Sequence, residues 1–400
     1  MQSMTDATET VSLTGSPREI GATWGRLNAR ALHAQCEAFV QTARERGIDR
    51  DELLRRAQVG VDIVERVAPH WREEADATAN AAGIERDLHL AYHVGKYREL
   101  VFLADECTSY AAGGSATAHG STVFHKSRDN VVRPQVAYVK RQHLPGVHAF
   151  LTLSDTSDLG CMMMVNERGL AGSADTGAQE PNPTGRGLMN PWGLRQIAER
   201  AATCEEALAI LQQWTAQRWY AGGRRATNWM FADAAGNVLR VVNWNDRLEP
   251  QWQRDGYLLS CERAGLREFM DAHAGTLDDA AFMAAARLPG VSFDSTISAL
   301  TVEIDAVAPE RSVAWVCVGR PGRLPFVPLA LSVERMPVAL LDGSLSRPPA
   351  EEGLPPEQVA ALEAEFRARA QATDPGDVAA LEELTAACVR DALGALQALE

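Results

Sequence analysis

The sequence predicts an α+β fold in which layers of antiparallel strands pack with helices. Short apolar segments between residues 110 and 318 come in pairs separated by turn residues, a pattern typical of antiparallel hairpins. Helical stretches precede, separate and follow these groups of strands, instead of alternating strand by strand as in βαβ units. The chain has 400 residues, which fits one large domain with appendages or two to three units.

The first hundred residues are expected to be mainly helical. Residues 16–19 (Ser-Pro-Arg-Glu) have the composition of a helix start, because serine caps the first N–H groups and proline suits the first helical position. Apolar residues recur behind this start at helical spacing. Two further helices are predicted over about 50–68 and 70–82, and a third ends near Phe102.

The strand candidates begin after this helical part. In chain order they are 110–112, 122–126, 136–140, 149–153, 161–165, 170–174, 228–232, 238–242, 258–261, 299–304 and 313–318. The fifth and sixth, the seventh and eighth, and the last two are expected to form hairpins across turns. Helices are expected over 194–214 (as two), over 263–287, and beyond Pro349, where a Pro/Gly-rich stretch at 343–356 is the best linker candidate.

Composition restricts the class of partner. The formal charge of −14 argues against binding to nucleic acid or to an anionic membrane, because both are themselves anionic. The N-terminus has no basic segment followed by an apolar core, and no stretch approaches the roughly 18 apolar residues that span a bilayer. We therefore expect a cytoplasmic protein that acts on a small molecule. The sequence does not indicate an oligomeric state.

The cysteines and histidines do not form a metal-binding pattern. The seven cysteines are scattered, with no C-x-x-C pair and no zinc-ligand spacing, so neither a metal nor a cofactor is expected. His119 and His125 lie near one hairpin without a third ligand at a suitable spacing. They are expected to be a solvated loop histidine and a strand histidine.

Cys107 differs from the other cysteines in its surroundings. It precedes Thr108 and Ser109 at the start of a strand candidate, and Asp129 follows 22 residues on. If the Glu106–Cys107 bond is cut, Cys107 gains a free α-amino group beside its own sulfur. The nucleophile and the general base then belong to one residue, and no histidine partner is required.

Attack by Cys107 on an amide would require further groups. The new α-amine, with a pKa near 8, can act as the base, and Asp129 is the nearest acid that could orient it. Lys126 or Arg128 could hold a substrate carboxylate. Strand alternation limits this set, because residues 126 and 128 share one face and residues 127 and 129 share the other. If Asp129 faces the thiol, Ser127 accompanies it and the two cations lie opposite.

Three segments of the chain resemble the cysteine N-terminal-nucleophile hydrolases, in particular the isopenicillin-N acyltransferase-like family (peptidase family C45). Residues 15–21 (Gly-Ser-Pro-Arg-Glu-Ile-Gly), followed by Trp-Gly, resemble the family's propeptide opening. Residues 107–129 resemble the nucleophile strand and its hairpin partner. Residues 166–171 (Asn-Glu-Arg-Gly-Leu-Ala) resemble the central hairpin, and 227–236 resemble the next one. The resemblance covers roughly residues 10–330.

The resemblance implies a four-layer αββα sandwich with a helical propeptide over 1–106, a catalytic domain over 107–345 and a C-terminal helical segment over 346–400. It implies that Cys107 is both the autoproteolytic and the catalytic nucleophile, that Asp129 lies near the new amine, and that the cleaved propeptide stays bound. The expected function is amide hydrolysis or acyl transfer on a small N-acyl or small peptide substrate, through an acyl-Cys107 intermediate.

Two departures from the family pattern leave alternatives open. Glu106 stands where the family commonly has glycine before the cysteine. Cys261 stands where an oxyanion-hole asparagine is expected, so Asn228 and backbone N–H groups become the candidate donors. Asp175 is a further candidate for substrate binding. The alternatives are a dipeptidase of the related family C69, which shares the Cys-Thr-(Ser/Thr) start, and a catalytically silent binding or scaffold protein with the same fold.

Overall fold

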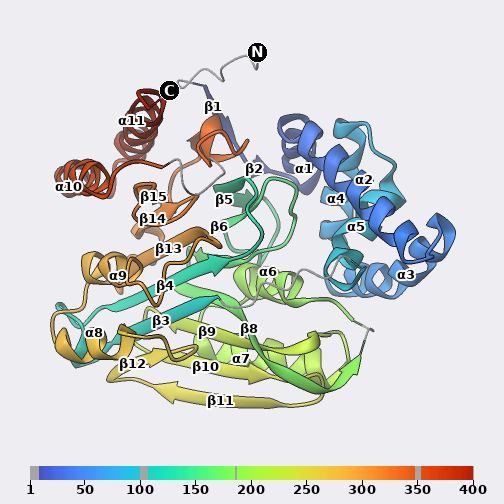
Figure 1. The fold of residues 1–400 in the computed structure, drawn as a ribbon, viewed down its shortest axis with the longest axis horizontal. Coiled ribbons are helices and arrows are strands. Elements are labelled where there is room, and N and C mark those ends of the chain that lie inside the picture. Colours follow the sequence, from blue (N-terminus) through green and yellow to red (C-terminus); the bar gives the residue numbers. More distant parts are fainter. Residues whose placement is uncertain (1–8, 100–106, 185–186, 347–352, 400) are drawn as a thin grey trace.

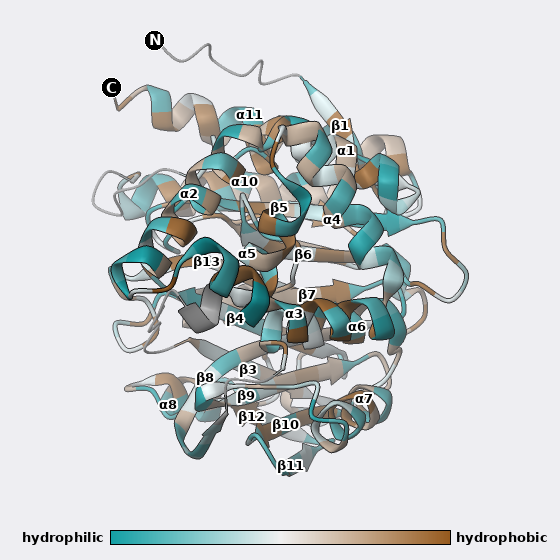
Figure 2. Ribbon diagram, turned by 90° about the vertical axis from the view of Figure 1, so that its right-hand side faces the viewer, coloured by the Kyte–Doolittle hydropathy of each residue, from teal (hydrophilic) through white to brown (hydrophobic). Residues whose placement is uncertain are grey.

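Two β-sheets stacked face to face, with helices on their outer sides, form the centre of the chain (Figure 1). The structure, a computed structural model, describes residues 9–99, 107–184, 187–346 and 353–399. Figure 2 shows hydrophobic colouring gathered on the strand layers in the middle of the molecule and mixed colouring on the helices around them. This four-layer αββα arrangement confirms the predicted fold class.

The larger sheet contains most of the central strands. Its members are β2 (Thr14–Gly15), β5 (Gln135–Gln142), β6 (Phe150–Asp155), β7 (Met163–Asn166), β8 (Leu170–Thr184), β9 (Gly223–Asp233), β10 (Val238–Asn243) and β11 (Leu248–Gln253). Their order across the sheet is β11-β10-β9-β8-β7-β6-β5-β2. Neighbours pair antiparallel, except that β2 joins β5 in parallel.

The smaller sheet begins directly after the predicted nucleophile. Its members are β3 (Thr108–Gly113), β4 (Thr122–Asp129), β12 (Gly256–Leu259), β13 (Thr296–Ile304), β14 (Val313–Cys317) and β15 (Val327–Ala330). Their order is β12-β3-β4-β13-β14-β15. A separate two-stranded sheet pairs β1 (Thr10–Ser12) with β16 (Arg335–Pro337). The strands β3 and β4 contact β8 and β9 of the larger sheet, so the two sheets pack directly above the start of β3.

The three predicted hairpins are confirmed as β7–β8, β9–β10 and β13–β14. Gly169 and Gly236, in the first two turns, have φ of 80° and 88°, a conformation that glycine adopts without steric cost. The helical segment expected over 263–287 is confirmed. This segment forms two short helices, α8 (Leu266–Ala272) and α9 (Asp279–Ala285), because the chain turns at Gly275 with φ of 89°.

Helices cover the outer face of each sheet. The predicted pair over 194–214 is confirmed as α6 (Asn190–Arg200) and α7 (Cys204–Ala216), which pack on the larger sheet. On the smaller sheet, α9 contacts β4 and β13, while α10 (Pro356–Ala372) and α11 (Val378–Gln397) contact β15. Across the described ranges, no helix combines the length and the apolar character that crossing a bilayer requires.

Five helices of the described N-terminal part stand to one side of the sheets (Figure 1). They are α1 (Pro17–Leu27), α2 (Ala29–Glu45), α3 (Arg50–Val67), α4 (Pro69–Ala82) and α5 (Arg86–Glu99). The predicted start of α1 is confirmed, because Ser16 and Glu19 cap each other's backbone N–H groups. The predicted end of the third helix near Phe102 lies outside the described residues.

The helices α1 and α4 pack with their backbones in close approach. A Cβ atom at Gly21 would lie 2.3 Å from the carbonyl oxygen of Glu74, and one at Gly25 would lie 2.3 Å from that of Thr78. Only glycine fits at either position without moving the helices apart. This contact holds α4 in place against the sheets.

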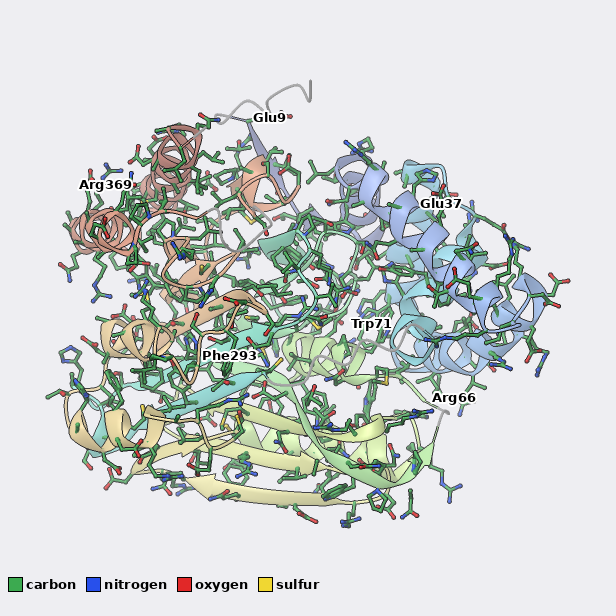
Figure 3. All side chains as sticks on the ribbon, viewed as in Figure 1. Glu9, Glu37, Arg66, Trp71, Phe293 and Arg369 are labelled. Carbon is green, nitrogen blue, oxygen red and sulfur yellow. The ribbon has the colours of Figure 1, made fainter. Side chains whose placement is uncertain are left out.

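A buried ionic network joins α4 to the rest of the chain. Glu74 accepts hydrogen bonds from Lys140 of β5 at 2.6 Å and from Arg195 of α6, and all three side chains are at most 4 % exposed. Arg195 also pairs with Glu199 at 2.8 Å, and Glu199 accepts from the indole N–H of Trp71. Figure 3 shows Trp71 at this junction between α4 and α6. Although burial alone would raise it, the pKa of Glu74 is lowered by Arg195 and Lys140.

Candidate active site

Cys107 lies one residue before β3, at the edge of the space between the two sheets. Its side chain is buried, with 9 % of the residue exposed. The sulfur donates to the backbone carbonyl of Asp129 at 3.9 Å. By strand alternation it shares a face with Ser109, whose hydroxyl donates to Asp175 of β8 in the opposite sheet at 2.9 Å. The nucleophile candidate therefore faces the inter-sheet space.

Lys126 is a cation whose charge opposes the effect of burial on the pKa of this thiol. Its ammonium forms a buried ion pair with Asp175 and donates to the carbonyl of Ala174 at 3.2 Å. Burial alone would lower the pKa of Lys126, but Asp175 and Cys107 together raise it above its usual value. Lys126 thus remains charged beside the sulfur, where a thiolate would form.

Asp129 is the last residue of β4, and its backbone carbonyl accepts from the thiol. Its Oδ1 accepts from the hydroxyl of Thr296 at 2.5 Å. Its Oδ2 is buried and has no hydrogen-bond partner among the described residues. Burial raises the pKa of Asp129 to about 7, against the Thr296 hydrogen bond and the charge of Lys126, which lower it. A carboxyl group with this pKa can exchange a proton near neutral pH.

Strand alternation predicts that Lys126 and Ser127 project to opposite faces of β4, and the structure shows this separation. Lys126 projects between the sheets, whereas His125 and Ser127 project to the opposite face and hydrogen-bond each other at 2.9 Å. Asp129 has the parity of that opposite face, but it ends the strand, where the pairing of β4 with β13 shifts register. The thiol therefore meets the side chain of Lys126 and the backbone carbonyl of Asp129.

Arg128 shares the face of Lys126 but lies farther along the strand. Its guanidinium donates to Asp155 of β6 at 2.8 Å and to Gln135 of β5 at 2.8 Å. Burial alone would raise the pKa of Asp155, but Arg128 and Arg133 hold it at about 2. A substrate carboxylate would compete with Asp155 for Arg128, and the substrate-binding roles of Arg128, Lys126 and Asp175 stay predictions.

The predicted oxyanion donor Asn228 contacts the segment that directly follows β12. Asn228 of β9, directly opposite Asp175 in the sheet, donates to the carbonyl of Ser260 at 3.3 Å. Ser260 in turn accepts the N–H of Ser109 at 2.9 Å. Cys261 donates through its sulfur to the carbonyl of Cys107 at 3.6 Å. Asn228 therefore lies within a short hydrogen-bonded chain that ends at the nucleophile, and its role as oxyanion donor stays a prediction.

Arg263 belongs to the same site, although the sequence gave no reason to select it. Its Nε donates to Thr108 Oγ1 at 2.9 Å and its Nη2 donates to the carbonyl of Cys107 at 3.4 Å. Its guanidinium lies over the ring of Phe293, 5.4 Å from the centroid. Arg263 follows β12 by four residues and lies 156 residues from Cys107 in the chain. No local pattern connects the two residues, and only the pairing of β12 with β3 brings them together.

The pKa of the Cys107 thiol is raised in the intact chain. Burial raises the pKa of Cys107, the charges of Asp175 and Asp129 raise it further, and Lys126 acts in the opposite direction. His125 does not serve as a base for it, because His125 faces away from the inter-sheet space and stacks on Tyr110. Among the described residues, no group of three or more potential ligands could hold a metal ion.

Comparisons with known proteins identify distant structural likenesses. No protein-family model and no curated protein matches the chain. Similar solved structures include an N-acylethanolamine-hydrolyzing acid amidase ortholog from Caenorhabditis elegans, with a TM-score of 0.41, 11% identity, and coverage of 53% of this chain and 100% of that one. Penicillin V acylase from Agrobacterium tumefaciens has a TM-score of 0.40 and 13% identity, covering 56% of this chain and 86% of that one.

A third structure is a mutant conjugated bile acid hydrolase from Clostridium perfringens, with a TM-score of 0.40, 11% identity, and coverage of 56% of this chain and 92% of that one. Likenesses at this level do not support any particular reaction for this chain.

Proposed function

We propose that the chain is an autoprocessed cysteine amidohydrolase or N-acyltransferase that acts on a small N-acyl or small peptide substrate through an acyl-Cys107 intermediate. The observation that carries this proposal is the surroundings of the Cys107 sulfur. The charge of the buried Lys126 acts on this sulfur, and the thiol donates to the backbone carbonyl of Asp129, whose carboxyl group has a pKa of about 7 and an oxygen without a partner among the described residues. The charge of Lys126 favours the thiolate, and the carboxylate of Asp129 is a base that can take up the thiol proton near neutral pH.

Processing uses the side chains alone, because the α-nitrogen of Cys107 is still in a peptide bond. The thiol gives its proton to Asp129, directly or through a water, and the thiolate attacks the carbonyl carbon of Glu106. The C–N bond breaks, and the nitrogen of Cys107 takes up a proton to become a free amine. Water then hydrolyses the thioester, which releases the carboxylate of Glu106 and restores the thiol.

Turnover repeats these steps with the new amine in place. The α-amine of Cys107, with a pKa near 8, becomes the base that lies beside the sulfur. The unpartnered oxygen of Asp129 provides an acceptor for this amine and would fix its position. Lys126 stabilises the thiolate, and Asn228 with backbone N–H groups stabilises the oxyanion. Water completes hydrolysis, and an amine in its place completes acyl transfer.

The fragment 1–106 is proposed to stay bound after cleavage. Glu74 and Trp71 belong to this fragment, whereas Lys140 and Arg195 belong to the remainder. Separation would expose an apolar interface and leave buried charges without partners, at a cost of about 3–5 kcal/mol for a broken buried pair.

The alternative of a catalytically silent protein has one observation in its favour, the raised pKa of the Cys107 thiol in the intact chain. Electrophilic labelling separates the two proposals. The processed protein is expected to react fastest at Cys107, because cleavage supplies the amine and opens the site. Equal labelling of Cys107 and Cys261 by a limiting amount of iodoacetamide would contradict an activated nucleophile. The Cys261→Ala variant is the matched control, since it removes the neighbouring thiol.

A further inference from the structure

Arg263 holds a position that the proposed reaction does not use. Its guanidinium is oriented by hydrogen bonds to Thr108 and to the carbonyl of Cys107, and it packs over Phe293. Figure 3 shows Phe293 near the ends of β3 and β4. The side chain is half-buried, so part of it reaches the surface beside the nucleophile. A cation fixed in this way is suited to holding an anionic group of a substrate.

The charge of Arg263 influences the pKa values of two neighbouring groups in the site. Burial is the largest influence on the pKa values of Asp129 and Cys261 and raises both, and Arg263 acts in the opposite direction on each. The whole chain carries a formal charge of −14, so a cationic group beside the nucleophile departs from its general character. Arginine is the side chain best suited to bind a carboxylate, through its planar set of N–H donors.

The residue before the nucleophile indicates what kind of acyl group the site accepts. In processing, the acyl group that Cys107 receives is that of Glu106, one residue from the carbonyl to which Arg263 donates. A glutamyl acyl group is a five-carbon glutaryl chain with a nitrogen on its second carbon and a carboxylate at its far end. Cys107 accepts the acyl group both in processing and in turnover. The glutamyl group of the chain and the acyl group of the substrate therefore have to fit the same site.

We propose that the substrate is an amide of glutaryl type, whose acyl half ends in a carboxylate bound by Arg263. This inference rests on the proposed function and names the substrate class for it. The thiolate of Cys107 attacks the amide carbonyl, the C–N bond breaks, and the amine leaves with a proton. Water hydrolyses the glutaryl thioester to a free dicarboxylate and the thiol, so no further reactant is required.

The test compares two chromogenic amides on the processed protein. Glutaryl-p-nitroanilide and pentanoyl-p-nitroanilide have acyl chains of equal length, but only the first carries the distal carboxylate. The expected preference in kcat/KM for the glutaryl amide is about 10- to 100-fold, the range that a charge-assisted hydrogen bond gives. Pentanoyl-glycine, with its carboxylate in the amine half, is the third substrate and is expected to gain no such advantage.

Variants assign the preference to Arg263. Arg263→Met is expected to abolish it, because kcat/KM falls about 10- to 100-fold further for the glutaryl amide than for the pentanoyl amide, through a higher KM for the glutaryl amide. Arg263→Lys retains part of the preference. Arg267→Met is the matched control, because Arg267 is exposed and pairs with Glu262 on the surface.

The outcomes distinguish this inference from the proposed function. Equal turnover of the two anilides would overturn the inference and leave an amide hydrolase. A preference for pentanoyl-glycine that is lost in Arg263→Met would also overturn it, by placing the carboxylate in the amine half. No turnover of any of the three by the cleaved protein would contradict the proposed function and the inference with it. If Arg263→Met fails to fold, slower cleavage of Glu106→Gln than of the wild type is the expected result, and an unchanged rate would overturn the inference.

Discussion

Lys126 and Asp175 form an ion pair across the two sheets, and the charge of Lys126 opposes the effect of burial on the pKa of the Cys107 thiol. The two side chains are 1 % and 2 % exposed. The pair joins β4 of the smaller sheet to β8 of the larger one, so the positive charge beside the nucleophile is held by both sheets. Mutations can separate the contribution of this ion pair to folding stability from the contribution of Lys126 to the reaction.

Removing the lysine alone leaves a buried carboxylate without its cation. Lys126→Met is expected to lower the free energy of unfolding by about 3 kcal/mol or more. Lys126→Met combined with Asp175→Asn is expected to recover most of this loss, because no buried charge remains. Urea denaturation measures both values. Cleavage before Cys107 should be impaired in the single and the double variant alike, and normal cleavage in the stable double variant would remove Lys126 from the mechanism.

Asp129 is expected to make the stability of the intact chain depend on pH. Its pKa is raised from 3.8 to about 7, so the folded state binds this proton more tightly than the unfolded state does. The resulting stability is fully present below about pH 4 and is lost as pH rises through about 7. Asp129→Asn should therefore be more stable than its parent at pH 8 and show little advantage at pH 4. The Cys107→Ala background keeps all samples uncleaved, and an equal difference at both pH values would contradict the raised pKa.

The same pKa predicts how processing depends on pH. If ionised Asp129 accepts the thiol proton, the cleavage rate of newly synthesised chain should rise about tenfold per pH unit below 7 and level off above it. Cell-free synthesis followed by timed mass spectrometry gives this rate. Asp129→Asn should be slow and lack the change near pH 7. A wild-type rate that is independent of pH between 5 and 8 would exclude Asp129 as the base.

Glu74 is expected to hold the N-terminal fragment in place. Glu74→Gln removes the charge that pairs with Lys140 and Arg195, so unfolding should become easier by about 3–5 kcal/mol. In the processed protein, the 1–106 fragment should then separate from the remainder at lower urea concentrations during gel filtration. Glu73→Gln is the adjacent control, because Glu73 is 47 % exposed and makes a surface pair with Arg18. Identical behaviour of the two variants would contradict the role of Glu74.

Much of the fold could be predicted because its determinants are local. The start of α1 follows from Ser16 and Glu19, and two of the hairpins follow from turns containing Gly169 and Gly236. The strands β1, β2, β11, β15 and β16 were not predicted. Four of them have two to four residues, and β11 is a mostly exposed edge strand, so none shows a clear apolar alternation. Their pairing depends on partners far away in the chain.

The site could be predicted only in part for the same reason. Cys107, Asp129 and Lys126 lie on neighbouring strands joined by one hairpin, so the sequence could associate them. Thr296 and Arg263 reach the site from distant segments, and nothing in their local sequence distinguishes them. The alternation of side chains along β4 was not enough to predict whether Lys126 or Asp129 faces the thiol. The strand ends at Asp129, where its register with β13 shifts.

The central claim is that the chain cuts itself before Cys107, and intact-mass measurement of the denatured purified protein tests it most directly. The proposal predicts two species that correspond to residues 1–106 and 107–400, and a single species of 43.4 kDa for Cys107→Ala. Lys126→Arg, which keeps the charge, is expected to retain cleavage. A single 43.4 kDa species for the wild type, or two fragments for Cys107→Ala, would contradict an autocatalytic cysteine nucleophile.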